Sequence, residues 1–329
     1  MTCSPPAAPP GIRPRRRSAA GTGWWPSRCC KPTRGAISPS YARVVDRVHV
    51  IGASGRTGAA LCRALRGAGV DIVPVIRDPA KWASLGNGPV RVADLGDHAA
   101  LTAALHGARH VVSCAHARHA PSVLAAAPAD ASYVFLGSTR KFTRWPDAHG
   151  RGVQAGEAAF LASGRAGVML HPTMIYGAEG EDNVQRLAAL LRRLPIVPLP
   201  GGGRALVQPI HQDDLTSCIR AALARDWSGP ETLVVAGPEP VAYAEFVREV
   251  AAAAGLARPR LVPLPAWLLI AAALPTALLP VVPTIRPAEI RRLLEDKAFD
   301  IGPMVATLGV QPIPLQDGLA RTFAPQHKG

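Results

Sequence analysis

The chain has 329 residues, of which 48% are hydrophobic, and it carries a formal net charge of +14. This hydrophobic fraction excludes a wholly disordered protein, and the length allows one large or two modest domains. The charge does not indicate a nucleic-acid partner, because residues 1–45 hold +8 of it and the remaining +6 is spread over residues 46–329 without a basic run.

Residues 1–45 form a Pro-rich and Arg-rich extension with no acidic residue and no apolar periodicity. Such a segment cannot bury enough apolar surface to fold alone, so we expect it to be disordered. An organellar transit peptide is the alternative, since these peptides are also poor in acidic residues and contain Arg and Ser.

Short apolar runs alternate with helix-like segments from Arg47 onward. We expect strands over residues 48–51, 71–76, 90–92, 110–114, 133–136, 167–170 and 232–235. We expect helices over residues 56–68, 99–105 and 155–161. Strands that alternate with helices predict a parallel sheet with right-handed crossovers. The predicted fold is therefore α/β, a Rossmann-type doubly wound parallel sheet with a smaller C-terminal substrate-binding region.

A glycine-rich turn joins the first predicted strand to the first predicted helix. Gly52 would permit the tight turn, Gly55 would let the backbone approach a pyrophosphate, and Gly58 would let the helix pack on the sheet. The N–H groups at the helix N-terminus would then bind the negative phosphates. The turn predicts a dinucleotide site made by Gly52, Ser54, Gly55, Arg56, Thr57 and Gly58.

The end of the second predicted strand indicates which dinucleotide is bound. NAD-binding proteins place a carboxylate there for the adenosine ribose, but this chain has Ile76 followed by Arg77. A guanidinium at this point would pair with a 2′-phosphate, so we expect NADP, with NAD as the alternative. In that alternative Arg77 is only solvated and Asp78 serves the ribose.

These observations divide the chain into three parts. Residues 1–45 are the disordered extension, and residues 46–177 form the NAD(P)-binding domain. Residues 178–329 are mostly a substrate-binding region for a small molecule, apart from one returning strand near residues 231–237 that completes the sheet. Nothing in the sequence predicts the oligomeric state.

An uncharged stretch occupies residues 261–285. Its length would allow a membrane span, but five prolines interrupt it and the longest run without proline is residues 266–274. A run this short cannot cross a bilayer as a helix. We therefore expect buried helices or peripheral contact with a membrane surface.

The six cysteines do not indicate a metal site, because no Cys-x-x-Cys and no Cys/His cluster is present. Three of them lie in the extension. Cys62, Cys114 and Cys218 are isolated in apolar segments, which is typical of buried free thiols. A reducing cytoplasm is the simplest compartment for such a protein.

Several ordered segments resemble a known family. They are the loop at residues 52–58, Val92-Ala93-Asp94-Leu95, residues 111–115, residues 136–139, residues 171–177 and residues 208–214. Together they make the chain similar to atypical members of the short-chain dehydrogenase/reductase superfamily, on the side of the NAD(P)-dependent epimerase/dehydratases. The similarity runs from about Arg47 to Phe323.

The resemblance implies a role for each matching position. Asp94 and Leu95 would border the adenine, and Ala115 would line the cofactor near its ribose. Ser138 or Thr139 would lie beside the nicotinamide as a catalytic hydroxyl. Pro172 and Thr173 would close over the nicotinamide. For Asp213 and Asp214 we expect only capping of the helix that begins before Leu215.

One family feature is absent from the sequence. Active relatives carry Tyr-x-x-x-Lys on the helix before the sixth strand, where the lysine lowers the pKa of the tyrosine. None of the four tyrosines here is followed by lysine four residues later. With Glu157 as the anchor, His149 falls near the tyrosine position and Val153 near the lysine position.

Other groups could replace the lost acid. His149 titrates near neutrality, and Lys141 would do so if burial lowered its pKa. His116 and His119 follow the fourth predicted strand, at the sheet edge where ligands bind in this architecture. For each of these side chains taken singly, a surface or structural role is the simpler interpretation.

Two functions are consistent with these residues. The first is hydride transfer between NADP(H) and a carbonyl, alcohol or quinone-like group without the Tyr-Lys dyad. The second is a non-catalytic NADP(H)-binding sensor or assembly module, which could be membrane-associated through residues 261–285.

Overall fold

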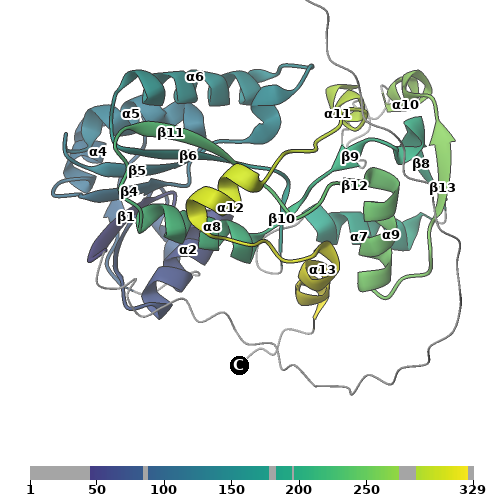
Figure 1. Cartoon of the computed structure of the whole chain (residues 1–329), viewed down its shortest axis with the longest axis horizontal. Coiled ribbons are helices and arrows are strands. Elements are labelled where there is room, and N and C mark those ends of the chain that lie inside the picture. The colour runs from purple at the N-terminus through teal and green to yellow at the C-terminus, as the bar shows by residue number, and fades with distance from the viewer. Residues whose placement is uncertain (1–44, 84–87, 178–182, 195, 274–286, 325–329) are drawn as a thin grey trace, which may run out of the picture. The chain divides into compact units, whose positions relative to one another are not determined.

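A parallel sheet of seven strands is the largest sheet of the described residues (Figure 1). The structure is a computed structural model that describes residues 45–83, 88–177, 183–194, 196–273 and 287–324. Residues 1–44 of the predicted extension are therefore not among the described residues. The strand order is β11-β6-β5-β4-β1-β2-β3. The strands are β1 (Arg47–Ile51), β2 (Asp71–Ile76), β3 (Arg91–Val92), β4 (His110–Ser113), β5 (Ser132–Leu136), β6 (Gly167–Pro172) and β11 (Pro230–Val235).

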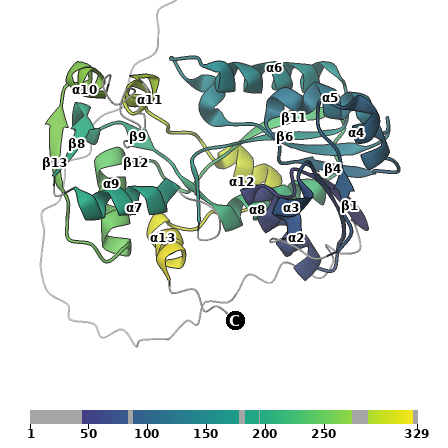
Figure 2. The same ribbon diagram turned by 180° about the vertical axis from the view of Figure 1, so that it is seen from behind.

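Helices cover both faces of this sheet, as the alternating sequence pattern predicts (Figures 1 and 2). One face packs against α2 (Arg56–Gly67), α8 (Gln212–Leu223) and α12 (Gly302–Leu308). The other packs against α4 (His98–Ala104), α5 (Ala120–Ala126) and α6 (Ala148–Ala162). Apolar side chains of the strands alternate between the two cores, since successive residues of a strand point to opposite faces. The predicted doubly wound α/β fold is confirmed.

The order of the strands reverses between β1 and β4. From β1 the chain proceeds to β2 and β3 on one side, and it then returns to build β4, β5, β6 and β11 on the other. Ile51 at the end of β1 lies in register with Ser113 at the end of β4. In open α/β sheets ligands bind outside the carboxyl ends of the strands at such a reversal, so this edge is where a site is expected.

Short elements at this edge shape the loops that follow the strands. They are α3 (Pro79–Ala83) after β2, the 3₁₀ turn η1 (Ala117–His119) after β4 and the 3₁₀ turn η2 (Thr139–Phe142) after β5.

A second core lies in the C-terminal part of the chain, around Tyr176, Phe246 and Leu319. Its strands are β7 (Ile175–Tyr176), β8 (Ile196–Pro200), β9 (Leu206–Val207), β10 (Ile210–His211), β12 (Val241–Ala242) and β13 (Arg260–Leu264). They pair two by two as β7 with β10, β9 with β12 and β8 with β13. The other elements are α7 (Asn183–Arg193), the 3₁₀ turn η3 (Gly201–Gly203), α9 (Tyr243–Ala253), α10 (Ala266–Ala273), α11 (Pro287–Arg292) and α13 (Leu315–Phe323).

The uncharged stretch at residues 261–285 contains β13 and α10, and its remainder from residue 274 lies outside the described residues. Among the described residues, no helix is long and apolar enough to cross a membrane. The stretch therefore begins as a short strand and an eight-residue helix at the edge of the C-terminal core.

One expectation about helix capping is wrong. The sequence suggested that Asp213 and Asp214 cap a helix, but both lie inside the first turn of α8, and the side chain of His211 accepts the capping hydrogen bond from Asp213 N. Asp214 is buried and accepts from Ile313 N (3.1 Å), so it ties α8 to the C-terminal segment instead. Burial raises the pKa of Asp214 to about 6.

Candidate functional site

The glycine loop between β1 and α2 brings backbone segments close together. Gly52 has φ +75°, a conformation that L side chains rarely adopt, and its N–H donates to Val75 O (2.9 Å). A Cβ on Gly52 would lie 3.3 Å from Ala115 N, at the start of the loop after β4. Gly52 and Ala115, which the sequence assigns to one cofactor, therefore lie side by side.

The third glycine allows α2 to approach the strand. A Cβ on Gly58 would lie 2.2 Å from Gly52 O and 2.9 Å from Ala53 Cα, a spacing that no side chain tolerates. Gly55 is the N-cap of α2 in an extended conformation, and as a glycine it brings no capping side chain to this helix end. The N-terminus of a helix is where backbone N–H groups and the helix dipole favour an anion such as a phosphate.

The remaining loop residues surround this helix end. Ser54 and Thr57 are partly buried and Arg56 is exposed. Thr57 Oγ1 lies 3.4 Å from Gln212 Oε1 of α8. Arg56 and Thr57 lie in the first turn of α2, next to the helix N-terminus.

Arg77 follows β2 directly and is exposed, as a group that reaches a 2′-phosphate has to be. Asp78 Oδ1 accepts a hydrogen bond from Ala80 N (3.1 Å) and so already serves the first turn of α3. After β3, Asp94 Oδ1 accepts from Gly96 N (2.8 Å), and Leu95 packs against the core beneath α4. All four residues lie at the carboxyl edge of the sheet.

A cavity of about 410 Å³ opens beside the ends of β5 and β6. Thr139 Oγ1 donates to Pro172 O (3.2 Å), whereas Ser138 Oγ accepts from Arg140 N (3.2 Å). Thr173 is buried, and its Oγ1 has no hydrogen-bond partner among the described residues. The residues that line the cavity are Ser138, Thr139, Arg140, Phe142, Thr143, Arg144, Thr173, Met174, Glu289, Arg292, Leu293, Glu295, Asp296, Lys297 and Phe299.

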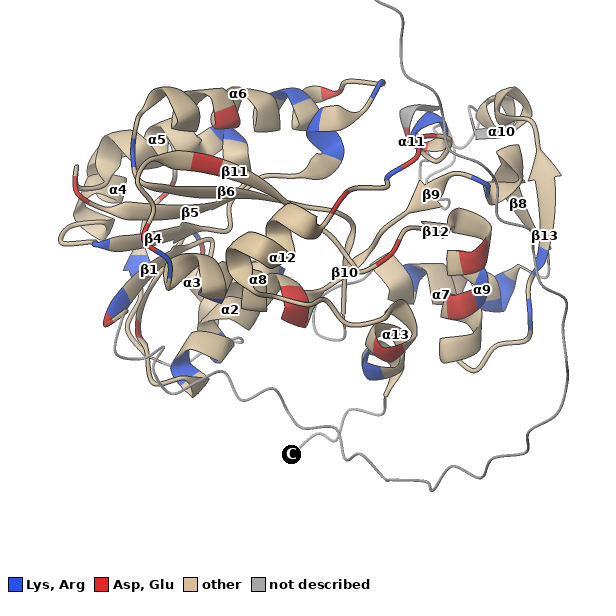
Figure 3. Ribbon diagram, in the orientation of Figure 1, with Lys and Arg blue, Asp and Glu red and all other residues tan. Residues whose placement is uncertain are grey.

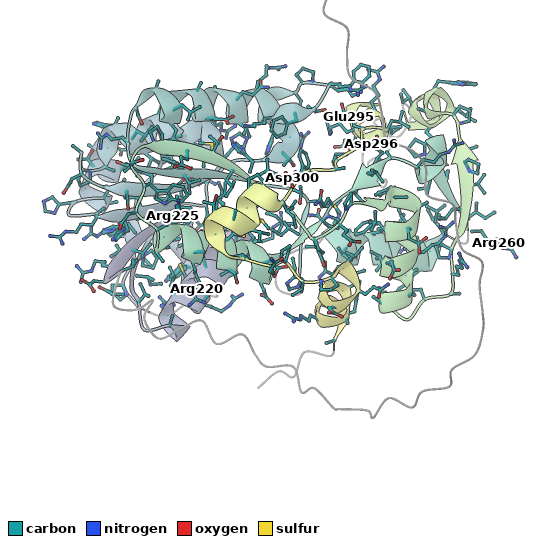
Figure 4. The ribbon with its side chains drawn as sticks, viewed as in Figure 1. Arg220, Arg225, Arg260, Glu295, Asp296 and Asp300 are labelled. Atoms are coloured by element: carbon teal, nitrogen blue, oxygen red, sulfur yellow. The ribbon has the colours of Figure 1, made fainter. Side chains whose placement is uncertain are left out.

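The segment after α11 forms the far wall of this cavity (Figure 4). Glu295 accepts hydrogen bonds from Thr143 Oγ1 (2.7 Å) and Arg144 N (2.6 Å), and Asp296 accepts from Leu206 N (2.9 Å). Glu295 thus holds this wall to the loop after β5, and Asp296 holds it to β9. The sequence did not identify these residues as part of the site, because no local pattern relates them to the strand ends that they face.

Basic groups of the cavity are also held in place. Arg140 and Arg292 both bind Asp147, the latter at 3.1 Å. Lys297 Nζ donates to Arg292 O (2.7 Å), and burial lowers the pKa of this lysine. Because these side chains are already held, binding of a ligand beside them would cost little further side-chain entropy.

A buried ion pair supports the loop that carries Ser138 and Thr139. Lys141 Nζ binds Glu157 Oε1 of α6 and lies 3.3 Å from Nε2 of His171 in β6. His171 Nδ1 accepts from Ser138 N (3.2 Å), so the ring proton must be on Nε2, which lies 3.3 Å from Glu157 Oε1. Lys141 is consequently engaged by Glu157 and lies near His171, and it is not among the described residues that line the cavity.

The predicted substitute acids do not meet in the cavity. His149 is exposed on α6, and its ring packs edge-on against His116 at 4.3 Å. His119 receives a hydrogen bond from Arg118 (3.1 Å). Val153, at the position expected for lysine, is buried. No tyrosine is among the described residues that line the cavity.

Acid should destabilise this site through His171. Burial and the charge of Lys141 lower the pKa of His171 to about 4, below the 6.5 of an unfolded chain. Between these values only the unfolded state binds the proton, so stability falls as the pH drops, by about 2 kcal/mol from pH 7 to pH 5. Urea unfolding at both pH values measures this loss, and His171→Asn should make it smaller. An unchanged loss in the variant would contradict the assignment.

The residues present fit a dinucleotide. The glycine cradle, residues 52–58, turns at Gly52 and lets α2 approach the end of β1 at Gly58, where an added Cβ would collide with backbone atoms. The N-terminus of α2 is part of this loop. Thr173 Oγ1 is a buried polar atom left for a ligand at the other end of the same sheet edge. Residues 52–58 would hold the pyrophosphate, and Thr173 would lie toward the nicotinamide.

Comparison with known proteins gives the same result. Residues 52–144 match the NAD(P)H-binding family. The NADPH-dependent quinone oxidoreductase QOR2 from Escherichia coli, solved with NADPH, has a TM-score of 0.65 and 19% identity over 84% of this chain and 99% of that one. No curated protein matches the sequence.

Two further solved structures share the fold. The UDP-glucose 4-epimerase of Thermus thermophilus, in complex with NAD, has a TM-score of 0.63 and 18% identity over 84% of this chain and 97% of that one. The protein gox2253 has a TM-score of 0.66 and 20% identity over 85% of this chain and 97% of that one. The chain therefore contains an NAD(P)H-binding domain in residues 52–144 and has the Rossmann-type fold of these proteins, as its resemblance to the short-chain dehydrogenase/reductase superfamily predicts.

Proposed function

We propose that the chain is an NADP(H)-dependent oxidoreductase that reduces a quinone-like or carbonyl group without a Tyr-Lys dyad. The observation that carries the proposal is the cavity beside Ser138, Thr139 and Thr173, at the same sheet edge as the glycine cradle. Its volume of about 410 Å³ lies in the range of small-molecule pockets. When bound, NADPH would supply the hydride, and the protein would position both reactants.

Ser138 is the hydroxyl best placed to assist a substrate oxygen. Its Oγ accepts from Arg140 N, so its own hydrogen remains available for donation into the cavity. The hydrogen of Thr139 is already donated to Pro172 O. A hydrogen bond from Ser138 would stabilise the negative charge that develops on the substrate oxygen as it is reduced.

A quinone-like substrate agrees best with the lining of the cavity. No tyrosine is among its described lining residues, and the lysine there donates to a backbone carbonyl. Reduction of a quinone spreads the added charge over a conjugated system, so it needs less proton transfer in the transition state than reduction of a simple ketone. Solvent would supply the proton afterwards.

A non-catalytic NADP(H)-binding module is the second candidate. The pairing of His149 with His116 outside the cavity favours it, because the residue nearest the usual tyrosine position is then not directed at a substrate. Such a module would bind NADPH tightly but would not oxidise it, whichever acceptor is added.

Arg77→Glu should reverse the preference for the phosphorylated cofactor. The loss of one charge-assisted contact to the 2′-phosphate corresponds to roughly a 10- to 100-fold weaker affinity for NADPH, while the affinity for NADH changes little. Fluorescence titration with both nucleotides measures the two affinities, and Arg109→Glu, at an exposed site on the opposite edge of the sheet, is the matched control. An equal loss of affinity for NADPH and for NADH would show that Arg77 does not bind the 2′-phosphate.

Ser138→Ala should lower kcat by about 10- to 100-fold and leave NADPH binding unchanged, because it removes a donor that acts mainly in the transition state. Thr139→Val should have the smaller effect, since the hydrogen of Thr139 is committed to Pro172 O. The reverse order would assign the catalytic hydroxyl to Thr139.

The proposed reaction is tested by following NADPH absorbance with a panel of short-chain quinones, aldehydes, ketones and UDP-sugars. Turnover with quinones or carbonyl compounds supports the oxidoreductase. Tight NADPH binding without turnover of any acceptor supports the module instead.

A further inference from the structure

One face of the C-terminal region exposes apolar side chains that a folded chain normally buries. Trp267 is 70% exposed, Ile196 50%, Leu268 40% and Val262 38%. β8 and β13 are parallel neighbours, with Pro198 in register with Val262. Val197 and Leu199 of β8 are buried, so the alternate residues of this strand face outward.

α10 continues this face. It follows β13 after Pro265 and contacts β8, and its eight residues include no charged and no polar residue apart from the indole N–H of Trp267. None of its described side chains, residues 266–271, is fully buried. A helix that is apolar all round is expected to be enclosed, and this one is enclosed only on part of its surface. We call Ile196, Pro198, Val262, Trp267 and Leu268 the apolar face.

The segments that build the apolar face carry only positive charge. Residues 183–212 and 250–288 contain no Asp and no Glu. Exposed arginines lie in these segments, and Figure 3 shows basic residues at the end of β13 and on the neighbouring elements. Arg260 is exposed and in register with Ile196, at the end of β13 that is remote from α10 (Figure 4). The exposed arginines include Arg192, Arg193, Arg204, Arg258 and Arg260.

We propose that the apolar face binds the surface of an anionic lipid bilayer. A tryptophan with neighbouring aliphatic residues partitions into the boundary between headgroups and acyl chains, and arginines around it bind anionic headgroups. A second copy of this face would oppose the arginines of these segments to one another, and the segments themselves hold no acid to neutralise them, so the charge pattern disfavours self-association. The extension at residues 1–44 is itself basic and is disfavoured as the occupant for the same reason.

The binding surface lies next to the cavity. α11 packs against α10, and Glu289 and Arg292 of α11 line the cavity. A quinone dissolved in the bilayer would thus reach the cavity by a short path. This role in substrate supply rests on the proposed function, whereas binding to lipid does not.

The experiment compares binding of the full chain to vesicles of neutral phosphatidylcholine and to vesicles with added phosphatidylglycerol, by co-sedimentation. We expect binding to the anionic vesicles that weakens with salt. Trp267→Glu combined with Leu268→Glu should weaken it at least tenfold, because it places two acids where apolar groups would insert. Arg258→Glu and Arg260→Glu should each weaken it about fivefold or more. Leu161→Glu and Arg109→Glu, at exposed sites on α6 and at the start of β4, are the matched controls.

Two outcomes would overturn the proposal. Binding that persists unchanged in the Trp267/Leu268 variant would assign it to another part of the chain, the basic extension above all. A concentration-dependent dimer that the same variant abolishes, with no vesicle binding, would assign the apolar face to a second copy. Turnover of a water-soluble quinone without vesicles should be equal in the variant and the wild type. If neither protein turns over the quinone, the proposed function is contradicted, whereas the result on lipid binding still stands.

Discussion

Gly55→Val is expected to abolish NADPH binding while the fold remains intact. The φ and ψ of Gly55 are −80° and 166°, which valine adopts readily, and its Cβ would lie 3.2 Å from Gly52 O, so only a small adjustment is needed. The added side chain would stand where a pyrophosphate approaches the N-terminus of α2. The loss of two charge-assisted hydrogen bonds corresponds to an affinity at least about 100-fold weaker in a fluorescence titration with NADPH.

Two glycines of the same helix provide the controls. Gly58→Ala forces a Cβ to within 2.2 Å of Gly52 O and should lower the free energy of unfolding by roughly 1–3 kcal/mol through overpacking. Gly67, at the other end of α2, has no atom within 4 Å of its added Cβ, so Gly67→Ala should leave NADPH binding unchanged and stabilise the protein by up to about 1 kcal/mol. Wild-type affinity for NADPH in Gly55→Val would contradict the proposal that the loop at residues 52–58 binds the pyrophosphate.

Removal of either member of the Lys141–Glu157 pair should cause the largest loss of stability among the substitutions considered. The two side chains are 12% and 14% exposed, so either one alone would be a nearly buried charge without its partner. Lys141→Met or Glu157→Leu should therefore cost about 3–5 kcal/mol in urea unfolding, nearer the lower value because some solvent reaches the pair. The double variant should recover most of this loss, because it removes both charges together.

The same variants report on His171. The charge of Lys141 helps to lower the pKa of His171, so Lys141→Met should raise it, as the ring resonances would show in an NMR titration. A double variant as unstable as the sum of the single variants would mean that the two charges do not interact. An unchanged pKa of His171 in Lys141→Met would show that the charge of Lys141 does not act on His171.

The sequence predicts the central sheet well, for a local physical reason. The strands β1, β4, β5 and β6 are short apolar runs that are buried almost throughout, and the turn after β1 carries glycines where φ or close packing demands them. Such signals lie within a few residues of one another. The existence of the seven strands, their parallel direction and the loop at Gly52, Gly55 and Gly58 therefore follow from the sequence.

The substrate side could not be predicted in the same way. Asp147 meets Arg292 across 145 positions of the chain, and Thr143 meets Glu295 across 152. Contacts between such distant segments leave no periodic pattern, and a single sequence contains no other sign of them. Lys141 was considered as an acid on its position alone, but it is engaged by its partner Glu157. The hydroxyls of Ser138 and Thr139 were proposed as catalytic groups only through the family resemblance.

In the proposed reaction, NADPH bound at the glycine cradle reduces an acceptor in the cavity beside Ser138. Stopped-flow absorbance at the NADPH band, with the protein loaded with NADPH and mixed with a short-chain quinone, follows this reaction. We expect an oxidation rate that saturates with quinone, falls about 10- to 100-fold in Ser138→Ala and disappears in Gly55→Val. NADPH that binds tightly but is not oxidised by any quinone or carbonyl compound would contradict the proposed reaction and would leave the chain as a non-catalytic nucleotide-binding module.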